Sequence, residues 1–462
     1  MSKLETISPI DGSIYFSCEQ HDEKDIQRTL NQAKQSLVDW SNLELAERIK
    51  LVSAFVDAIE NQKAEIAEEI TWQMGRPLSQ SPGEINGFVE RARYMLDIAE
   101  ESLKPIETDA KDGFDRWIEL EPLGVVAVLS PWNYPLLTSV NAIVPALVAG
   151  NTVILKHSFQ TPLVAERYKK AAIKAGLPDG VFQILHIDHA LTSALIADPI
   201  VKGVFFTGSV DGGLSVQKAL SNKFIHCGLE LGGKDPAYVA PDADLVQAVE
   251  NLVDGSFFNS GQSCCGIERI YVHESNYAQF VEAFVEITKK YQLGNPLDSG
   301  VNLGPVVKAS AADFVRGQID SAVRKGANTL IDEGLFMNSK KGTPYLAPQV
   351  LTNVDHSMEV MTEESFGPVV GIMSVKNHEE AITQMNDSKY GLTASIWTED
   401  KDLAKKIGGQ LETGTVFMNR CDYLDPALAW TGVKSTGRGV TLSKLGYHHV
   451  TRAKSYHFKT SK

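Results

Sequence analysis

Short apolar runs alternate with longer helix-like runs from residue 123 onward, and this alternation constrains the fold more than any other feature of the sequence. Residues 124–129 are apolar and rich in β-branched side chains, as expected of a strand that helices cover on both faces. Residues 136–149 then repeat as a helix does, and residues 152–156 form the next strand-like run. This βαβ unit predicts an α/β fold with a doubly wound parallel sheet, whose ligand site lies at the carboxyl ends of the strands. The pattern continues with expected helices and strands at residues 161–175, 181–185, 191–197 and 201–206.

The remaining chain adds helices before this unit and a second alternating region after it. Residues 23–75 and 85–103 carry apolar side chains at helical spacing, and residues 116–121 alternate as an exposed strand does. Strands and helices alternate again over residues 230–409, which predicts a second α/β domain. Residues 450–462 are basic and aromatic, and they fit either an added strand or a frayed tail.

Charge and composition exclude several classes of function. The 462 residues include 44 Lys and Arg against 58 Asp and Glu, and the resulting charge of −14 opposes binding to nucleic acid and anionic membranes. Prolines and asparagines interrupt the most apolar region, residues 122–156, so we expect buried core there and not a membrane span. Residues 1–11 are polar where a secretory signal is basic and then apolar. We therefore expect a cytoplasmic protein with no nucleic-acid or membrane partner.

Two adjacent cysteines follow a glycine turn in the segment FFNSGQSCC, residues 257–265. The chain has five cysteines and no CxxC pair, which argues against a disulfide framework or a zinc site and fits a reducing compartment. A thiol presented just after Gly261 is a strong nucleophile if its pKa is lowered, which makes Cys264 a candidate. A buried, inert pair remains open on these residues alone.

A glutamate stands in an apolar, strand-like context in the segment GLELGGKD, residues 228–235. Partial burial raises the pKa of a carboxyl group, so Glu230 is a candidate general base near neutral pH. An exposed glutamate at a strand edge is the alternative. The segment also matches the start of a phosphate-binding GxxxxGK loop, but Asp235 stands where that loop requires Ser or Thr, and we reject an ATP site.

Two further turns follow expected strands. In PWNYP, residues 131–135, prolines flank Asn133, whose amide could stabilise an oxyanion, although an ordinary turn asparagine fits as well. In FTGSVDGG, residues 206–213, small residues lead into a helix expected to begin near Gly213, and a helix N-terminus attracts phosphate. No GxGxxG dinucleotide motif occurs in the chain.

Taken together, these segments resemble the aldehyde dehydrogenase superfamily over nearly the whole chain. The resemblance implies an aldehyde dehydrogenase-like α/β fold: two doubly wound parallel-sheet domains plus a small β oligomerisation arm. It implies a dinucleotide-binding domain at 1–103 and 123–232, a catalytic thiol domain at 233–430, and an arm and tail at 104–122 and 431–462. The motifs follow the family's order: PWNYP at 131–135, ILKHS at 154–158, FTGS at 206–209, LELGGK at 229–234, FNSGQSC at 258–264, EESFGPV at 363–369, and NRC through GVKSTGRG at 419–439.

The resemblance also implies a mechanism. Cys264 would attack the aldehyde, Asn133 would hold the oxyanion, a thioester would form after hydride transfer to NAD(P), and Glu230 would activate water to release the acid. Cys265 would be a bystander, and no metal would be needed. A homodimer or homotetramer would form through the arm. The cofactor would be held by Trp132, Lys156, Ser158, Phe159, Gly208, Ser209, Leu231, Glu364 and Phe366.

Two positions depart from the family's pattern. Many NAD-preferring members carry Glu three residues after the ribose-binding Lys156, but this chain has Phe159 there, so NAD is favoured over NADP by a small margin only. The expected substrate positions, Thr138, Asn141, Cys421 and Trp430, suggest a small polar aldehyde or a semialdehyde. The sequence identifies no arginine that would bind a substrate carboxylate.

Two alternative functions stay open at this point. A relative that transfers the acyl group to coenzyme A commonly lacks the glutamate base, so Glu230 argues against it. A catalytically silent relative would not need Cys264, Glu230 and Asn133 together.

Overall fold

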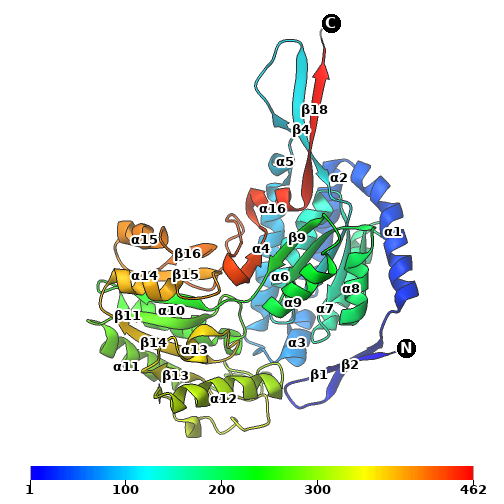
Figure 1. Cartoon of the computed structure of the whole chain (residues 1–462). Helices are drawn as coiled ribbons and strands as arrows, with labels where there is room; N and C mark the ends of the chain where they lie inside the picture. The colour runs from blue at the N-terminus through cyan, green and yellow to red at the C-terminus, as the bar shows by residue number, and fades with distance from the viewer. Residues whose placement is uncertain (1, 461–462) are drawn as a thin grey trace.

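The computed structural model describes residues 2–460 and contains two α/β domains and a long β arm (Figure 1). The fold class predicted from the sequence is confirmed. Each domain has its own central sheet, and a projecting arm made of segments far apart in the sequence extends from the first domain.

The first domain is built on a six-stranded sheet in the order β17-β9-β8-β5-β6-β7. All neighbouring strands run parallel except β17 and β9. The strands are β5 (Val125–Ser130), β6 (Thr152–His157), β7 (Phe182–Ile184), β8 (Val201–Thr207), β9 (His226–Glu230) and β17 (Gly437–Arg438).

Helices cover both faces of this sheet, which explains the unbroken apolar sequence of β5. Val126 and Val128 pack into a core that includes α6, whereas Val125 and Ala127 pack into a second core that includes α1. Because successive strand residues point to opposite faces, a strand buried on both must be apolar throughout. The helices of this domain are α1 (Glu23–Asn42), α2 (Leu45–Glu60), α3 (Lys63–Met74), α4 (Ser81–Asp97), α5 (Ala99–Ser102), α6 (Pro135–Val148), α7 (Pro162–Ala175), α8 (His189–Ala197), α9 (Val210–Ala219) and α16 (Ser443–His449).

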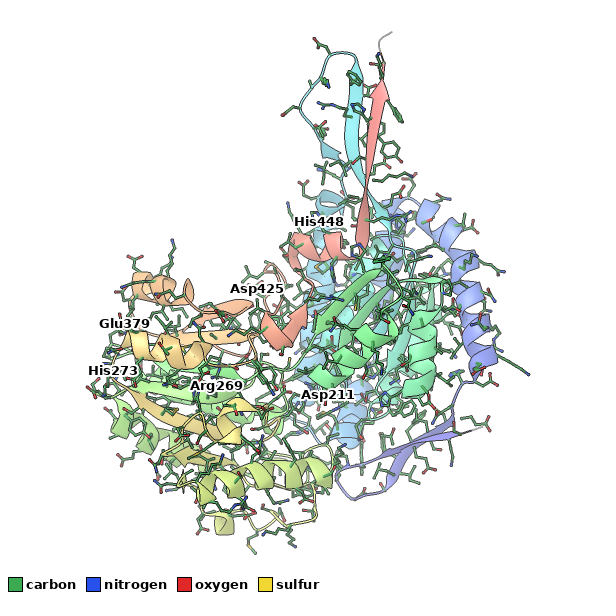
Figure 2. All side chains as sticks on the ribbon, in the orientation of Figure 1. Asp211, Arg269, His273, Glu379, Asp425 and His448 are labelled. Carbon is green, nitrogen blue, oxygen red and sulfur yellow. The ribbon has the colours of Figure 1, made fainter. Side chains whose placement is uncertain are left out.

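The second domain has a seven-stranded sheet in the order β12-β13-β14-β11-β10-β15-β16. Arg269 on β11 lies inside this domain (Figure 2), is 1% exposed and donates to the carbonyls of Gln384 and Met385 near the end of α14. Its elements are β10 (Asp235–Val239), α10 (Leu245–Phe257), η1 (Phe258–Gly261), β11 (Ile267–His273), α11 (Tyr277–Thr288), α12 (Ala309–Arg324), β12 (Asn328–Thr329), η2 (Glu333–Leu335), β13 (Gln349–Thr352), α13 (Glu359–Thr362), β14 (Val369–Val375), α14 (His378–Asn386), β15 (Thr393–Trp397), α15 (Lys401–Gly408), β16 (Thr415–Met418) and η3 (Lys434–Thr436).

The arm is a three-stranded antiparallel sheet in the order β18-β4-β3. Strand β18 (Thr451–Lys459) pairs along its whole length with β4 (Phe114–Pro122), and β3 (Ile106–Glu107) adds a short edge. Residues 451–459 are thus an added strand, as one of the two expectations for the carboxyl-terminal segment had it; its last two residues, 461–462, lie outside the described residues. The arm projects from the body at the top of Figure 1.

Two features differ from the expected layout. Residues 437–450, which the sequence grouped with the arm and tail, belong to the first domain, because β17 pairs with β9 and α16 packs on α6. A hairpin formed by β1 (Lys3–Ile7) and β2 (Ile14–Glu19) precedes α1 and was not expected.

Candidate active site

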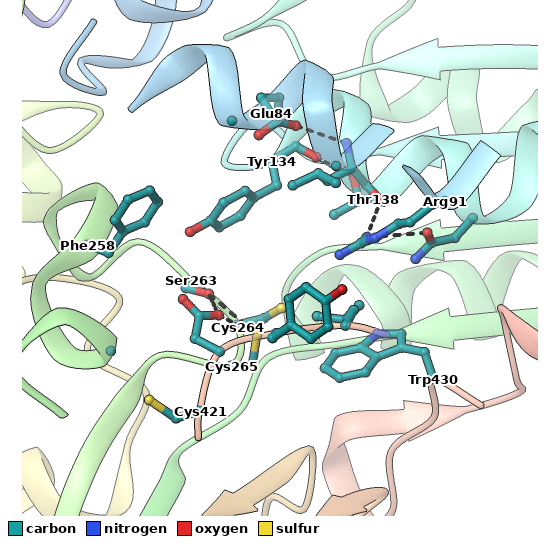
Figure 3. Close-up of a pocket in the computed structure, with 18 of the residues that line it drawn as sticks. Glu84, Arg91, Tyr134, Thr138, Phe258, Ser263, Cys264, Cys265, Cys421 and Trp430 are labelled. Atoms are coloured by element: carbon teal, nitrogen blue, oxygen red, sulfur yellow. Dashed lines mark hydrogen bonds between the residues drawn. The ribbon is translucent and has the colours of Figure 1, made fainter. Parts of the chain in front are cut away.

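A cavity of about 420 Å³ lies where strands β8 and β9 of the first domain end near α10 and η1 of the second (Figure 3). This is the carboxyl edge of the first sheet, where the sequence placed the ligand site. The cavity wall includes seven residues singled out from the sequence: Thr138, Asn141, Glu230, Leu231, Cys264, Cys421 and Trp430.

The backbone turns sharply just before Cys264. Helix α10 ends at Phe257, and Asn259, Ser260 and Gly261 then all have positive φ angles, between 52° and 70°. A side chain at Gly261 would place its Cβ 2.3 Å from the Gly367 carbonyl oxygen, so only glycine fits. The turn reverses the chain and brings the thiol of Cys264, which is half-buried, to the cavity wall.

The neighbouring cysteine has a different environment. Cys265 is 3% exposed, and its Sγ donates to Oδ1 of Asp422 at 2.9 Å. A hydrogen bond with the Cys264 side chain, burial and the nearby Asp422 carboxylate together hold the pKa of the Cys265 thiol well above its usual value. The Cys265 thiol is therefore protonated and hydrogen-bonded to Asp422, whereas the Cys264 thiol is the more accessible of the two.

Glu230 ends strand β9 and projects into the same cavity. Its carboxylate accepts hydrogen bonds from the hydroxyls of Thr207, at 3.1 Å, and Thr441, at 2.6 Å. Burial raises the pKa of the Glu230 carboxyl, although the two threonines oppose the shift. The half-buried carboxylate is thus held in place and made more basic than a fully exposed one.

Asn133 is 5% exposed at the end of β5 and lies beside the Cys264 turn. Its side-chain Nδ2 donates to the carbonyl of Gln262 at 3.2 Å, which ties the turn after β5 to the turn before the thiol. The backbone amide of Cys264 has no hydrogen-bond partner among residues 2–460. Two N–H groups can therefore point at an oxygen atom near the thiol.

A buried ion pair supports this arrangement, and sequence reasoning missed it. Arg76 and Glu84, both 1% exposed, lie 2.6 Å apart. Glu84 also accepts hydrogen bonds from the backbone amides of Leu136 and Leu137, each at 2.9 Å, in the first turn of α6. The helix dipole stabilises a negative charge at this end of a helix. Arg76 also donates to the Asn133 carbonyl.

At the end of β6, Lys156 occupies the expected ribose-binding position. Its Nζ lies 5.0 Å from the ring centre of Phe159, and burial lowers its pKa to about 8. The hydroxyl of Ser158 accepts from the amide of Gln160, which stabilises the turn between them. No carboxylate occurs at position 159 to select against a 2′-phosphate.

Helix α9 begins at Val210, earlier than expected, and Ser209 is its N-cap residue, accepting from the amide of Gly212 at 3.2 Å. A Cβ at Gly208 would lie 2.5 Å from the Phe206 ring, so the turn is packed too tightly for a larger residue. The first-turn amides of a helix lack partners within the helix and favour phosphate. These residues fit the pyrophosphate of a dinucleotide.

The remaining cofactor candidates lie at the junction of the domains. Glu364 accepts from the Gly233 amide at 3.1 Å, and burial, with Glu268 nearby, raises its pKa to about 8. Phe366 has a positive φ of 51°, and its ring meets that of Trp132 edge-on at 5.6 Å. Leu231 is buried beside Gly213 of α9. A glutamate that can accept or donate hydrogen bonds fits the hydroxyls of a ribose.

The four substrate candidates surround the rest of the cavity. The Thr138 hydroxyl donates to the Tyr134 carbonyl one turn back in α6, so its polar atom is already satisfied. Trp430 is 5% exposed and presents an aromatic wall. Burial raises the pKa of the Cys421 thiol, which argues against a reactive role. The Asn141 side chain accepts from Arg91, a residue of α4.

Arg91 is the main cavity residue that the sequence did not identify. It falls between Phe88, Ala92 and Met95, all of which are buried core. A charged residue on the apolar face of a predicted helix was the available signal. Its hydrogen bonds to Leu137 and Asn141 form only when α4 packs on α6.

No group of three His, Cys, Asp or Glu side chains that could hold a metal occurs within residues 2–460. Over the same range, no helix is both long enough and apolar enough to cross a bilayer.

Known proteins with this sequence pattern and fold are aldehyde dehydrogenases. The model of the aldehyde dehydrogenase family matches residues 1–456. A succinate-semialdehyde dehydrogenase [NADP(+)] from Mycobacterium avium (strain 104) is 33% identical, over 99% of this chain and 97% of that protein.

Two solved structures of enzymes with a bound cofactor have a fold similar to that of this chain. The succinic semialdehyde dehydrogenase from Streptococcus pyogenes in complex with NADP+ aligns with a TM-score of 0.94, at 27% identity, over 99% of this chain and 100% of that chain. The betaine aldehyde dehydrogenase from Staphylococcus aureus in complex with NAD+ aligns with a TM-score of 0.93, at 29% identity, over 100% and 92%. The chain therefore belongs to the aldehyde dehydrogenase family and is an NAD(P)-dependent oxidoreductase that converts an aldehyde to its carboxylic acid.

Proposed function

We propose that Cys264 is the nucleophile of this reaction and Glu230 the base that releases the acid. The observation that carries the proposal is that a half-buried thiol and a half-buried carboxylate share one cavity, while the second thiol, Cys265, is hydrogen-bonded to Asp422. A nucleophile and a base that face the same space can act in turn on one bound substrate.

In the first half of the reaction the Cys264 thiolate adds to the aldehyde carbon. The oxygen becomes negatively charged, and the side-chain amide of Asn133 and the backbone amide of Cys264 donate hydrogen bonds to it. Donors fixed before the reaction stabilise such an oxyanion strongly because they need not reorient. A dinucleotide bound beside this carbon would supply the acceptor for its hydride, and loss of the hydride leaves the acyl group on Cys264 as a thioester.

In the second half Glu230 takes a proton from a water molecule, which attacks the thioester carbon. The bonds from Thr207 and Thr441 hold the carboxylate in the orientation needed for this transfer. The C–S bond then breaks, the carboxylic acid leaves, and the departing sulfur takes up the proton held by Glu230, which restores the Cys264 thiol and the Glu230 carboxylate. Lys156, Ser209 and Glu364 would hold the dinucleotide at its ribose and phosphate groups, as argued above.

An aldehyde panel tests the proposal. Purified protein is mixed with aliphatic, aromatic and carboxylated aldehydes, with NAD or NADP, and formation of the reduced cofactor and of the acid is followed. The expected result is one acid formed per cofactor reduced. Adding coenzyme A tests the acyl-transfer alternative, and a coenzyme A thioester in place of the acid would contradict the role of Glu230.

The cofactor preference provides a prediction. Because Phe159 supplies no carboxylate, kcat/KM for NAD and NADP should differ by no more than about two decades, or ~3 kcal/mol. Phe159→Glu should raise the NAD/NADP ratio, since a carboxylate beside Lys156 repels a 2′-phosphate. Phe159→Gln is the control, because it removes the ring without adding charge. A wild-type enzyme that already rejects NADP more strongly would show that another residue carries the selectivity.

We also propose a homodimer or homotetramer formed through the arm, in a cytoplasmic location. Strand β18 is an edge strand, and the arm bears stacked aromatic side chains, with the Trp117 and Tyr456 rings 4.5 Å apart. Edge strands and projecting apolar side chains favour pairing with another subunit. All five cysteines are free thiols, which suits a reducing compartment.

A further inference from the structure

A buried arginine faces the substrate cavity without a charged partner. Arg91 is 7% exposed, and Figure 3 shows its side chain ending in the cavity between Thr138 and Trp430. Arg76, the other arginine of the cavity wall, forms a salt bridge with Glu84. Within residues 2–460 Arg91 makes no salt bridge.

The hydrogen bonds of Arg91 use only one part of its guanidinium group. Nη1 donates to the Leu137 carbonyl at 2.6 Å and to Oδ1 of Asn141 at 3.3 Å, which fixes the group against α6. Nε and Nη2 have no protein partner among the described residues. Together these two nitrogens form the edge of a guanidinium that binds a carboxylate through two parallel hydrogen bonds.

Three carboxylates of the cavity wall, Glu84, Glu230 and Asp422, are already hydrogen-bonded to other groups. Glu84 is bonded to Arg76 and to the first turn of α6, and Glu230 is bonded to Thr207 and Thr441. Asp422 accepts from Cys265 and from Ser263. Burial also lowers the pKa of Arg91, which reflects the cost of a charge removed from water. An unpaired buried charge is costly. An anion that enters this cavity would therefore give Arg91 the charged partner that the protein itself does not provide.

We propose that Arg91, oriented by Asn141, binds a carboxylate at the far end of the substrate, so that the enzyme acts on semialdehydes of dicarboxylic acids. The assignment rests on the proposed function, since it places the aldehyde end at Cys264 in the same cavity. Trp430 supplies an aromatic wall for the intervening carbon chain.

The test compares a dicarboxylic semialdehyde with the neutral aldehyde of the same chain length. The wild-type enzyme should have the higher kcat/KM with the semialdehyde. Arg91→Gln should lower the ratio of the two kcat/KM values by about 100-fold, mostly through KM for the semialdehyde, because a buried charge pair is lost. Arg91→Lys, which keeps the charge but not the two-nitrogen edge, should recover part of the ratio.

Arg93→Gln is the matched control. Arg93 lies two positions further along α4, is partly exposed and bonds to Ser53 and Asp57, outside the cavity. The control should leave the semialdehyde/neutral ratio at its wild-type value. If Arg91→Gln lowers both activities equally, Arg91 only supports α6 and the proposal is wrong.

A second measurement uses only the wild-type enzyme, so it tests the proposal even if an Arg91 variant does not fold. Saturated dicarboxylates should inhibit the wild-type enzyme in competition with a neutral aldehyde, whereas the corresponding diols should not. Equal inhibition by acids and diols would overturn the anion site. If the wild-type enzyme oxidises neutral aldehydes but shows no preference for semialdehydes, only this inference fails; if it oxidises no aldehyde, the proposed function itself fails.

Discussion

Replacing Cys264 with alanine is expected to reduce aldehyde oxidation by about 10⁴-fold or more, while Cys265→Ala keeps most of the activity. Loss of a covalent nucleophile removes the whole pathway, and in other enzymes costs this much. Cys265 instead lies buried beside Asp422, and Ser263 still donates to Asp422 when that thiol is removed. Steady-state rates of the two variants and the wild type check the prediction.

Chemical labelling gives an independent measurement of the same assignment. The raised pKa of Cys265 keeps its thiol protonated, so brief alkylation with iodoacetamide should modify the peptide at Cys264 and leave Cys265 unmodified. Bound cofactor or a competing aldehyde should slow the modification. Equal loss of activity in the two alanine variants, or label on Cys265 first, would contradict the choice of nucleophile.

Replacing Glu230 with glutamine is expected to separate the two halves of the reaction. Thiolate attack and hydride transfer use Cys264 and Asn133, so the first turnover should still give a burst of NAD(P)H of up to about one equivalent per active site. Thioester hydrolysis needs a base, and loss of such assistance typically costs about 10²–10⁴-fold, so the steady rate after the burst should fall by that factor. The hydroxyls of Thr207 and Thr441 remain able to hold the amide of the variant.

Rapid-mixing kinetics and intact-mass analysis check this prediction. The mass of the mixed sample should increase by one acyl group, located on the peptide that contains Cys264. A variant without a burst would mean that Glu230 is also needed to form the thiolate, and undiminished steady turnover would remove it from the mechanism. Thr441→Val is a useful companion, because it removes a hydrogen bond to the carboxylate but keeps the base.

The pH profile gives a further check on Glu230. Its pKa is raised by burial, so the carboxyl takes up a proton at a higher pH than an exposed glutamate does. Only the deprotonated form is a base, so hydrolysis should slow as the pH falls through this raised pKa. Glutamine does not titrate, and the acidic limb that belongs to this group should be missing in Glu230→Gln.

The sequence by itself predicted the fold class and seven residues of the cavity wall, because these features follow from local sequence patterns and motifs. The alternation of strands and helices is a consequence of burying strands such as β5 on both faces, and such strands are apolar throughout. The motif residues Cys264 and Glu230 stand at ends of elements, where a short turn fixes their direction. Glycine at 261 was readable as a turn, although the three positive φ angles before Cys264 were not.

The tertiary structure decided what depends on packing between distant segments. Only the fold brings the Thr441 hydroxyl to the Glu230 carboxylate and the Asp422 carboxylate to the Cys265 thiol. The second of these contacts distinguishes the buried Cys265 from the more accessible Cys264. The sequence grouped residues 437–450 with the arm and tail, because nothing local shows that β17 adds to β9. In the sequence, Arg91 is one of several charged residues within an expected helix and was not singled out. Its burial against α6, with two nitrogens left unpaired in the cavity, arises only when α4 and α6 meet, because the environment of a charge is set by its neighbours in space.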